Sequence, residues 1–393
     1  MRKNIRYTVT AVLAVAALTL SACGGGGGET NGGGAAGAET DGTTTSDGGG
    51  GSGETITINT ATMVQPNTPN APVVTWFFDQ LEERSDGRIE IDRTEPESIC
   101  KAPEIAECVR DGRVDLGISI SDYSAQVFPS MTVATIPFMV ENSQALMQSL
   151  YKVNMENESA RAQWENAGIE LIGGWGPGKL ILGSNEPVNN VADISGVRFR
   201  VTGAMLQRAF EEGGANVIAL PAAETYEGIE RGIADAVAWT MDGPVDYKLM
   251  EQLTTWTDPG VGHYTTFAIW MNKDFYDSIP DDLRAIVDEV RDELNGGAGM
   301  EAFNAVTETQ CTSLIEFPNT ESFTAWDAAA TAEWRDAVQA DLIEEWITQA
   351  EADGLADARG YLADYQAALD EASSQPDIVA DAVSACIDRF GAN

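Results

Sequence analysis

Residues 105–118 read IAECVRDGRVDLGI and contain a complete transition from helix to strand. The apolar spacing predicts a short helix over residues 103–111 that ends at Gly112, since glycine readily takes the left-handed conformation that closes helices. Residues 114–118 follow as a strand. Towards the N-terminus, the pattern predicts strands at 55–60 and 88–92 and a helix over 71–84. This order of strands and helices predicts an α/β unit with a largely parallel sheet.

The same alternation returns in the middle of the chain. Its predicted strands cover residues 170–172, 180–182, 197–201, 217–220, 236–239 and 265–271. Its predicted helices cover residues 205–212, 224–233 and 245–253. From residue 281 onward the chain is predicted to be nearly all helix, because apolar residues recur at helical spacing. The sequence therefore predicts an α/β protein with two lobes and a helical C-terminal segment that packs across both.

The first 22 residues have the features of a signal peptide. Three basic residues stand within the first six, and an apolar run over residues 9–20 follows. This run is too short for an ordinary membrane span. It ends in Leu20-Ser21-Ala22-Cys23, which resembles the lipobox of bacterial lipoproteins. We expect a signal peptide over residues 1–22 and a lipid on Cys23. The alternative is a plain secretory signal with an incidental cysteine.

Residues 23–54 are expected to form a flexible, glycine-rich tether behind the lipidated cysteine. After Cys23 they are almost entirely small, polar or acidic, and such a segment buries too little apolar surface to offset the entropy of ordering it. No later stretch is long and apolar enough to span a membrane. We therefore expect an exported protein, anchored by its lipid to the outer face of the cell membrane.

The charge of the chain restricts its partners. The sequence holds 62 Asp and Glu residues against 23 Lys and Arg residues, which gives a formal net charge of −39. A surface this acidic repels phosphate-rich molecules. Neither nucleic acid nor anionic lipid is therefore expected as a partner.

Four cysteines follow Cys23, and an even number in an exported protein indicates two disulfides. Three pairings are possible. Locality favours Cys100 with Cys108 and Cys311 with Cys386. A metal site is the competing interpretation, but it would have no histidine cluster to draw on, because His263 is the only histidine. We expect disulfides and no metal.

Signals for catalysis are weak. One histidine restricts nucleophile–base arrangements, and no G-x-S-x-G motif is present. Acid pairs such as Glu95 and Glu97 arise by chance in so acidic a chain. Residues 173–179 fit G-x-x-x-x-G-K, but Leu180 stands where a phosphate-binding loop needs Ser or Thr. We interpret this stretch as a crossover between lobes, and we expect neither an enzyme nor a cofactor.

Three stretches together carry a family resemblance. The first comprises GRIEI at residues 87–91, CVRDGRVDLG at 108–117, Phe128-Pro129 and Ile136-Pro137-Phe138. The second is DISGVRFRV at residues 193–201, and the third is Gly214-Ala215 with ETYEGIERGIADA at 224–236. In order and spacing they resemble the DctP-like solute receptors of tripartite ATP-independent periplasmic (TRAP) transporters. The resemblance covers residue 55 to about residue 294.

The resemblance implies a two-lobed, type II-like periplasmic-binding-protein fold. Lobe I is expected to comprise residues 55–177 with about 265–300. Lobe II is expected to comprise residues 178–264, with the C-terminal helices at about 301–393. The implied function is capture of a small organic acid by lobe closure and its delivery to the membrane permease subunits. A ligand sensor for a chemoreceptor or kinase, or an extracellular hydrolase, is the alternative.

Arg200 is the main candidate ligand-binding residue. The family holds its carboxylate with the arginine of a D-x-x-G-x-K-x-R motif, which here runs from Asp193 to Arg200, with Arg198 at the usual lysine. A guanidinium offers a planar fork that meets a carboxylate with two parallel bonds. The alternative is an edge strand in solvent whose arginines pair with surface acids. We expect that role for Arg198.

The remaining site candidates rest on position in the family pattern. Many members carry a basic residue near Leu180, where this chain has only the adjacent Lys179. Either Lys179 substitutes for it, or the ligand is less charged or more apolar than a dicarboxylate. Trp239 ends a predicted strand where members place a ligand contact, and it resembles receptors for monocarboxylates and keto acids. A buried core tryptophan is the alternative. Further wall candidates are Trp175, Tyr123 and Phe138.

Overall fold

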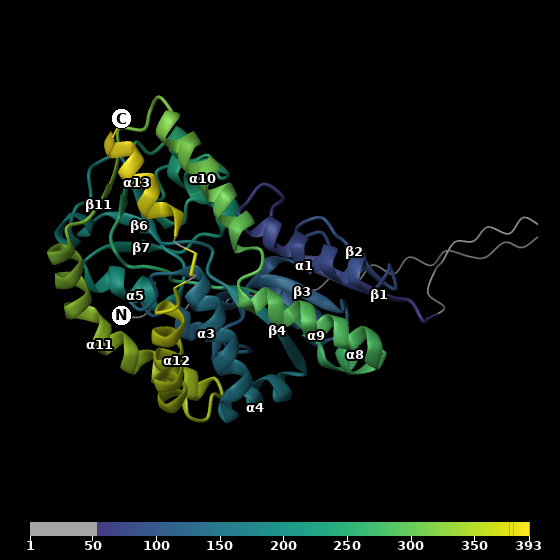
Figure 1. Ribbon diagram of the computed structural model, residues 1–393. Coiled ribbons are helices and arrows are strands. Elements are labelled where there is room, and N and C mark those ends of the chain that lie inside the picture. Colours follow the sequence, from purple (N-terminus) through teal and green to yellow (C-terminus); the bar gives the residue numbers. More distant parts are fainter. Residues whose placement is uncertain (1–52, 377, 380, 393) are drawn as a thin grey trace, which may run out of the picture. The chain divides into compact units, whose positions relative to one another are not determined.

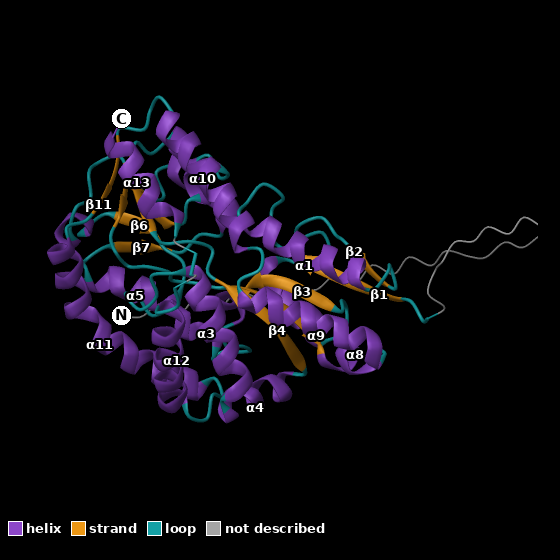
Figure 2. Cartoon of the chain, in the orientation of Figure 1, coloured by secondary structure: helices purple, strands orange, loops and turns teal. Residues whose placement is uncertain are grey.

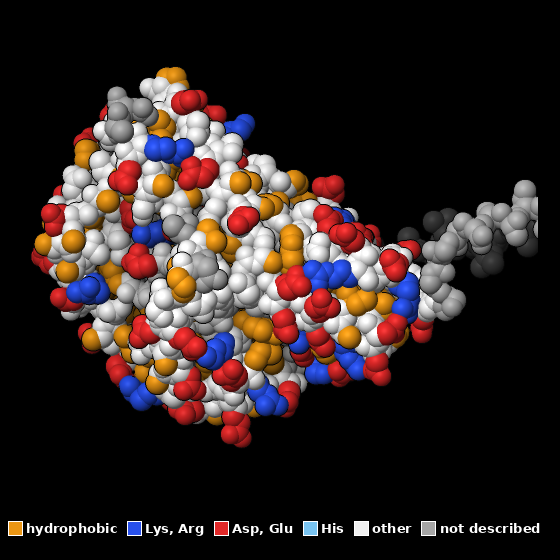
Figure 3. All heavy atoms as spheres, in the orientation of Figure 1, with side chains coloured by type: hydrophobic (Ala, Val, Ile, Leu, Met, Phe, Trp, Pro, Cys, Tyr) orange, Lys and Arg blue, Asp and Glu red, His pale blue; other side chains and the backbone are white. Residues whose placement is uncertain are grey.

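The computed structural model describes residues 53–376, 378–379 and 381–392. The predicted signal peptide over residues 1–22, the lipid site at Cys23 and the tether as far as residue 52 lie outside these residues. Within the described part, no helix has the length and apolar character needed to cross a membrane. On the face seen in Figure 3, acidic side chains are scattered among Lys, Arg and apolar side chains.

The first sheet has five strands. In spatial order they are β2 (Ile89–Asp92), β1 (Ile56–Thr62), β3 (Leu116–Ile120), β10 (Phe267–Asn272) and β4 (Ile169–Trp175). β1 pairs in parallel with both β2 and β3, as the alternation of strands and helices predicted. β10 lies antiparallel between β3 and β4. The sheet is therefore mixed, because a strand from much later in the sequence is inserted into it.

The second sheet has six strands. In spatial order they are β11 (Ser322–Ala325), β9 (Thr255–Asp258), β5 (Ile181–Ser184), β8 (Ala236–Trp239), β6 (Arg198–Arg200) and β7 (Asn216–Ile218). β6 is parallel to β7 and β8, and β11 is parallel to β9. β5 is antiparallel to both of its neighbours. The two sheets and their surrounding helices confirm the two-lobed α/β prediction (Figure 2).

The helices arise mainly where apolar spacing predicted them. The α-helices are α1 (Asn70–Arg84), α2 (Ile105–Arg110), α3 (Ser143–Glu156), α4 (Glu158–Ala167), α5 (Ala204–Glu212), α6 (Thr225–Glu230), α7 (Asp242–Val245), α8 (Lys273–Ser278), α9 (Asp281–Gly296), α10 (Met300–Glu316), α11 (Ala328–Ala352), α12 (Ala358–Ser373) and α13 (Ala382–Ala392). The short 3-10 helices are η1 (Ala102–Glu104), η2 (Ser121–Ser124), η3 (Met131–Thr135), η4 (Val191–Ile194), η5 (Ala222–Glu224) and η6 (Leu249–Glu251). α2 and α6 both lead into a glycine with positive φ, Gly112 at 67° and Gly232 at 66°, before the next strand.

The C-terminal helices brace both sheets. α11 packs against α5 beside the second sheet, whereas α12 packs against α3, which itself contacts β4 of the first sheet (Figure 1). α13 then packs against α10 and β11. Apolar side chains at helical spacing make these contacts, among them Trp334 and Leu342, both buried. The expected bracing helical segment is therefore confirmed.

Two expectations about local structure were wrong. The helix predicted over residues 245–253 is replaced by α7 and η6, and between them Lys248 has a φ of 57°, which interrupts a right-handed helix. The region after residue 281 was expected to be nearly all helix, yet it contains β11. Residues 322–325 become a strand because β9 offers them a parallel ladder of backbone hydrogen bonds.

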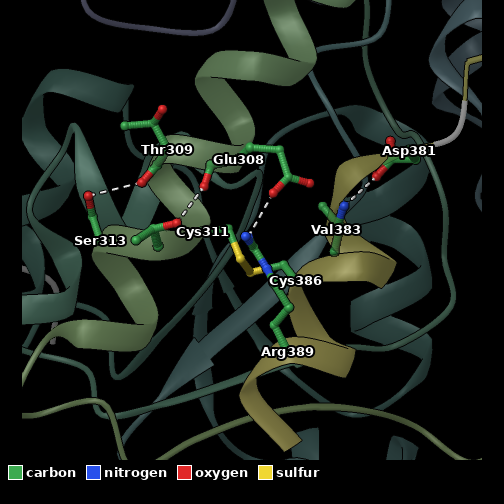
Figure 4. The surroundings of a disulfide bond; sticks show 9 residues. Glu308, Thr309, Cys311, Ser313, Asp381, Val383, Cys386 and Arg389 are labelled. Carbon is green, nitrogen blue, oxygen red and sulfur yellow. Dashed lines mark hydrogen bonds and ion pairs between the residues drawn. A yellow bond between two sulfur atoms is a disulfide. The ribbon is translucent and has the colours of Figure 1, made fainter. Parts of the chain in front are cut away.

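Both expected disulfides are present. Cys100 is bonded to Cys108, and Cys311 is bonded to Cys386. The second bond fastens α13 to α10, and an ion pair from Arg389 to Glu308 (2.8 Å) joins the same two helices (Figure 4). The C-terminal end of the described chain is thus tied to the second sheet's side of the molecule by a covalent bond and by charge.

Removal of the Cys311–Cys386 disulfide should destabilise the protein more than removal of Cys100–Cys108. The bonds close loops with sequence separations of 75 and 8 residues. The loop-entropy relation gives losses of about 4–5 and about 2–3 kcal/mol in the free energy of unfolding. Urea denaturation of the two double cysteine-to-alanine variants measures both losses. Equal losses would contradict the loop-entropy explanation.

Candidate functional site

The chain crosses between the two sheets in neighbouring segments. Residues 176–180 lead from β4 to β5, and residues 259–266 lead from β9 to β10. The two crossings hydrogen-bond to each other, because the Leu180 amide donates to the Gly262 carbonyl at 2.9 Å. The segment before α3 joins them, since the His263 amide donates to the Val140 carbonyl at 2.7 Å. These contacts tie the two sheets together along the crossings.

A cavity of about 840 Å³ lies between the parts of the chain that belong to the two sheets. On the side of the first sheet it is lined from segments 63–68, 97–103 and 122–123. On the side of the second sheet it is lined from segments 201–207, 219–224 and 246–247. Most of these segments follow the carboxyl ends of parallel strands, which is where open α/β sheets bind ligands.

Arg200 ends β6 beside this cavity and is 3% exposed. Its Nε donates to the Leu220 carbonyl at 3.1 Å, and its guanidinium carbon lies 3.9 Å from the centre of the Trp239 ring. Among the described residues no carboxylate forms an ion pair with it. Burial lowers the pKa of Arg200, whereas the nearby Tyr264 and Tyr123 oppose that shift. The result is a buried cation that forms no ion pair among the described residues, although the buried Asp242 lies near enough to oppose the lowering of its pKa.

Arg198, two residues earlier on the same strand, has the opposite environment. Its side chain is 45% exposed and forms an ion pair with Asp235, as the sequence predicted. This pairing lowers the pKa of Asp235. The two arginines of β6 thus have different environments. Arg198 lies at the surface, where Asp235 neutralises its charge, whereas Arg200 is buried and forms no ion pair among the described residues.

Trp239 and Tyr247 complete the wall behind the guanidinium. The Trp239 ring is 5% exposed, and its centre lies 4.8 Å from that of Tyr247. Gly243 at the start of α7 must be glycine, because a Cβ there would lie 2.6 Å from Cγ of Trp239. Beside them is Asp242, whose pKa is raised by burial, an effect that hydrogen bonds from Thr240 and Trp239 oppose.

Tyr123 approaches from the other lobe and lines the cavity. It lies in η2, directly after β3, and burial raises the pKa of its hydroxyl while the charge of Arg200 opposes the shift. The structure therefore brings three of the predicted residues together: Arg200, Trp239 and Tyr123. Their contact with a ligand remains a prediction.

Of the six candidates, only Tyr123 is among the residues that line the cavity, whereas Arg200 and Trp239 are buried behind that lining and the other three lie elsewhere. Trp175 is fully buried, donates from Nε1 to Asn70 at 2.9 Å and stacks on Phe267. Lys179 forms ion pairs with Glu141 (2.9 Å) and Asp258 (3.3 Å) at the crossings.

Phe138 packs edge-on against Trp334 of α11, with ring centres 5.4 Å apart. It has a φ of 64°, and its amide donates to the Val261 carbonyl at the crossing. Direct ligand contact by Phe138, Trp175 and Lys179 stays a prediction.

The sequence did not point to two acidic residues that line the cavity, Asp122 and Asp246. Burial raises the pKa of Asp122 to about 7 and that of Asp246 to about 6. Thr265 donates a hydrogen bond to Asp122, and Gln310 donates one to Asp246. Asp122 could have been found from its place just beyond the end of predicted strand 114–118. Asp246 could not, because residues 245–253 were assigned to a helix.

A model of the family described as bacterial extracellular solute-binding protein, family 7, matches residues 60–349. The chain belongs to this family. Its members are TRAP solute-binding proteins of the DctP type rather than enzymes. Membership of the family establishes the class of protein. Which ligand this chain binds depends on the residues around its cavity.

Curated relatives are distant. The 2,3-diketo-L-gulonate-binding periplasmic protein YiaO of Escherichia coli is 28% identical over 162 residues, which cover 41% of this chain and 49% of the relative. The match thus spans about half the length of that protein. The C4-dicarboxylate-binding periplasmic protein DctP of Rhodobacter capsulatus is 24% identical over 289 residues, 71% of this chain and 85% of the relative.

Solved TRAP solute-binding proteins share the fold. One from Bordetella bronchiseptica, with bound mandelate, has a TM-score of 0.69 at 22% identity and covers 80% of this chain and 99% of its own. One from Rhodoferax ferrireducens, with copurified benzoate, has a TM-score of 0.69 at 21% identity and covers 81% and 99%. At this identity the likeness establishes the two-lobed architecture and not the ligand.

The ligand-free protein should lose stability as the pH rises from about 5 to about 8. The folded pKa values of Asp122 and Asp246 lie above the ~3.9 of an unfolded aspartate, so the folded state binds more protons in this range. Their contribution is fully present below the unfolded pKa and disappears as the pH passes 6 and then 7. Melting temperatures across this range measure the slope.

The Asp122→Asn, Asp246→Asn double variant should flatten this pH profile. Glu104→Gln, an exposed acid at the end of η1, is the control and should keep the wild-type slope. An unchanged slope in the double variant would show that these carboxyl groups titrate normally.

Proposed function

We propose that the protein is the receptor of a TRAP uptake transporter, which captures a small organic acid and delivers it to the membrane permease subunits. The observation that carries the proposal is Arg200, a guanidinium that is 3% exposed and forms no ion pair among the described residues. A buried charge without a partner is strongly unfavourable. A ligand carboxylate would neutralise it with two parallel hydrogen bonds.

Capture would proceed by closure of the two lobes. Arg200 and Tyr247 belong to the side of the second sheet, whereas Tyr123 belongs to the side of the first. A carboxylate held by Arg200 would therefore be enclosed when Tyr123 approaches it. The hydrogen-bonded crossings at residues 176–180 and 259–266 would serve as the hinge. Closure changes the surface that a permease contacts, so the ligand-bound state can be recognised.

The named ligands of solved relatives support a carboxylate. The structures from Bordetella bronchiseptica and Rhodoferax ferrireducens hold mandelate and benzoate, and one from Pseudomonas aeruginosa holds L-malate. Each of these ligands presents a carboxylate that an arginine can bind in bidentate fashion. Organic acids are therefore the class to test first.

We also propose export and lipid anchoring. The basic start, the apolar run and the Leu20-Ser21-Ala22-Cys23 sequence support a cleaved signal and a lipidated Cys23 at the outer face of the cell membrane. Relatives named as periplasmic proteins support export.

Substitution of Arg200 should abolish or strongly weaken binding of organic acids. Loss of charged hydrogen bonds worth about 1.5–3 kcal/mol corresponds to a loss of affinity of about 10- to 150-fold in Arg200→Ala. Arg200→Lys should recover little, because an ammonium lacks the planar fork. Isothermal titration calorimetry with mandelate, benzoate and malate on the purified protein measures these affinities.

Arg198→Ala is the matched control, since it removes an exposed arginine from the same strand. It should bind as the wild type does. Arg200→Met should also raise the ligand-free melting temperature, because it removes an unpaired buried charge. Equal binding by Arg200→Ala and wild type would place the anion site elsewhere, and no binding of any acid to wild type would refute the proposed function.

A further inference from the structure

The charged residues that line the cavity are predominantly acidic. Glu97, Asp122, Glu224 and Asp246 line it, against Lys101 as the one basic lining residue among those described. The guanidinium of Arg200 lies behind this lining. A ligand that carries only negative charge would therefore meet one buried cation within a mostly acidic cavity. This is an unfavourable environment for a dicarboxylate.

The two lobes present the same pair of residues to the cavity. Asp122-Tyr123 lies in η2 just after β3 on the first side, and Asp246-Tyr247 follows the short helix α7, which comes after β8, on the second. The two tyrosines lie close together, since burial raises the pKa of the Tyr247 hydroxyl and the nearby Tyr123 adds to that rise. All four side chains line the cavity, and each is only partly buried, so a ligand can reach them. The cavity thus has an acid and an aromatic ring on either side.

Neither acid has a cationic partner among the described residues. Asp122 accepts a hydrogen bond from the neutral Thr265, and Asp246 accepts one from the neutral Gln310. The absence of a neighbouring cation agrees with their pKa values, which burial raises to about 7 and about 6. The site therefore has an unpaired cation at one position and two unpaired acids at others.

We propose that the ligand is a zwitterion, with one carboxylate for Arg200 and one ammonium or quaternary ammonium group for Asp122 and Asp246. The faces of Tyr123 and Tyr247 suit such a cation, because the negative face of an aromatic ring attracts it. The carboxylate and the cation of one molecule would neutralise both sets of unpaired charges together. This inference rests on the proposed function and narrows its ligand from organic acids to amino acid or betaine compounds.

Isosteric pairs of acids test the charge requirement directly. Glycine betaine is matched with 3,3-dimethylbutanoate, 4-(trimethylammonio)butanoate with 5,5-dimethylhexanoate, and phenylglycine with mandelate. The members of each pair have similar size and one carboxylate, and only one member is also cationic. Calorimetry on the purified protein should show at least one zwitterion binding about tenfold or more tightly than its partner, the scale of one partly desolvated cation–π contact.

The Asp122→Asn, Asp246→Asn double variant should lose this preference, because amides keep the shape of the carboxyl groups and remove their charge. Asp111→Asn, an exposed acid at the end of α2 and away from the cavity, should retain it. Melting temperatures of the ligand-free variants establish that each is folded.

The outcomes separate this inference from the proposed function. If the uncharged isosteres bind as tightly as the zwitterions and Arg200→Ala abolishes their binding, the receptor stands and the zwitterion proposal is overturned. If the double variant keeps the full preference, the two acids are not the cation site and the proposal is overturned as well. If no member of any pair binds the wild type, the carboxylate receptor itself fails.

Discussion

The paired crossings between the sheets are the constraint on which the molecule depends. β4 and β10 are antiparallel neighbours in the first sheet, and β5 and β9, which continue the same two segments, are antiparallel neighbours in the second. Between them, the Leu180 amide bonds to the Gly262 carbonyl. Gly176 must be glycine here, because a Cβ would lie 2.4 Å from the buried His263 ring. The two lobes are thereby joined at the crossings, and a cavity lies between them.

This arrangement explains why so acidic a chain can keep an unpaired arginine. Surface cations find partners, as Arg198 does with Asp235. Arg200 lies deeper, where stacking on Trp239 and a bond to the Leu220 carbonyl satisfy only part of the guanidinium. At the crossings the balance is reversed, since the buried Lys179 has two acids as partners. At the crossings, acids of the protein thus neutralise the charge of Lys179. At the cavity, the charge of Arg200 is left for a ligand to neutralise.

Only half of the candidate site could be predicted from the sequence. Arg200 and Trp239 end their strands and Tyr123 lies shortly after one, and residues at strand ends gather at one edge of a parallel sheet. Lys179 was inferred from its neighbour Leu180, yet its side chain forms ion pairs with Glu141 and Asp258 at the crossings. Asp246 and Tyr247 escaped notice because their segment has helical spacing but is broken at Lys248.

The sequence by itself determined the class of fold, the main helices and the two disulfide pairs. The fold class and the helices follow from short-range properties, namely apolar spacing and glycines such as Gly112 at helix ends. The disulfide pairs follow from the cysteine count, because Cys100 and Cys108 are close along the chain and the two cysteines left over, 75 residues apart, then pair with each other. Only the tertiary structure decided the antiparallel insertion of β10, the strand β11 and the meeting of Asp122-Tyr123 with Asp246-Tyr247. Each brings together segments more than sixty residues apart, and such contacts depend on packing and backbone pairing that no local pattern encodes.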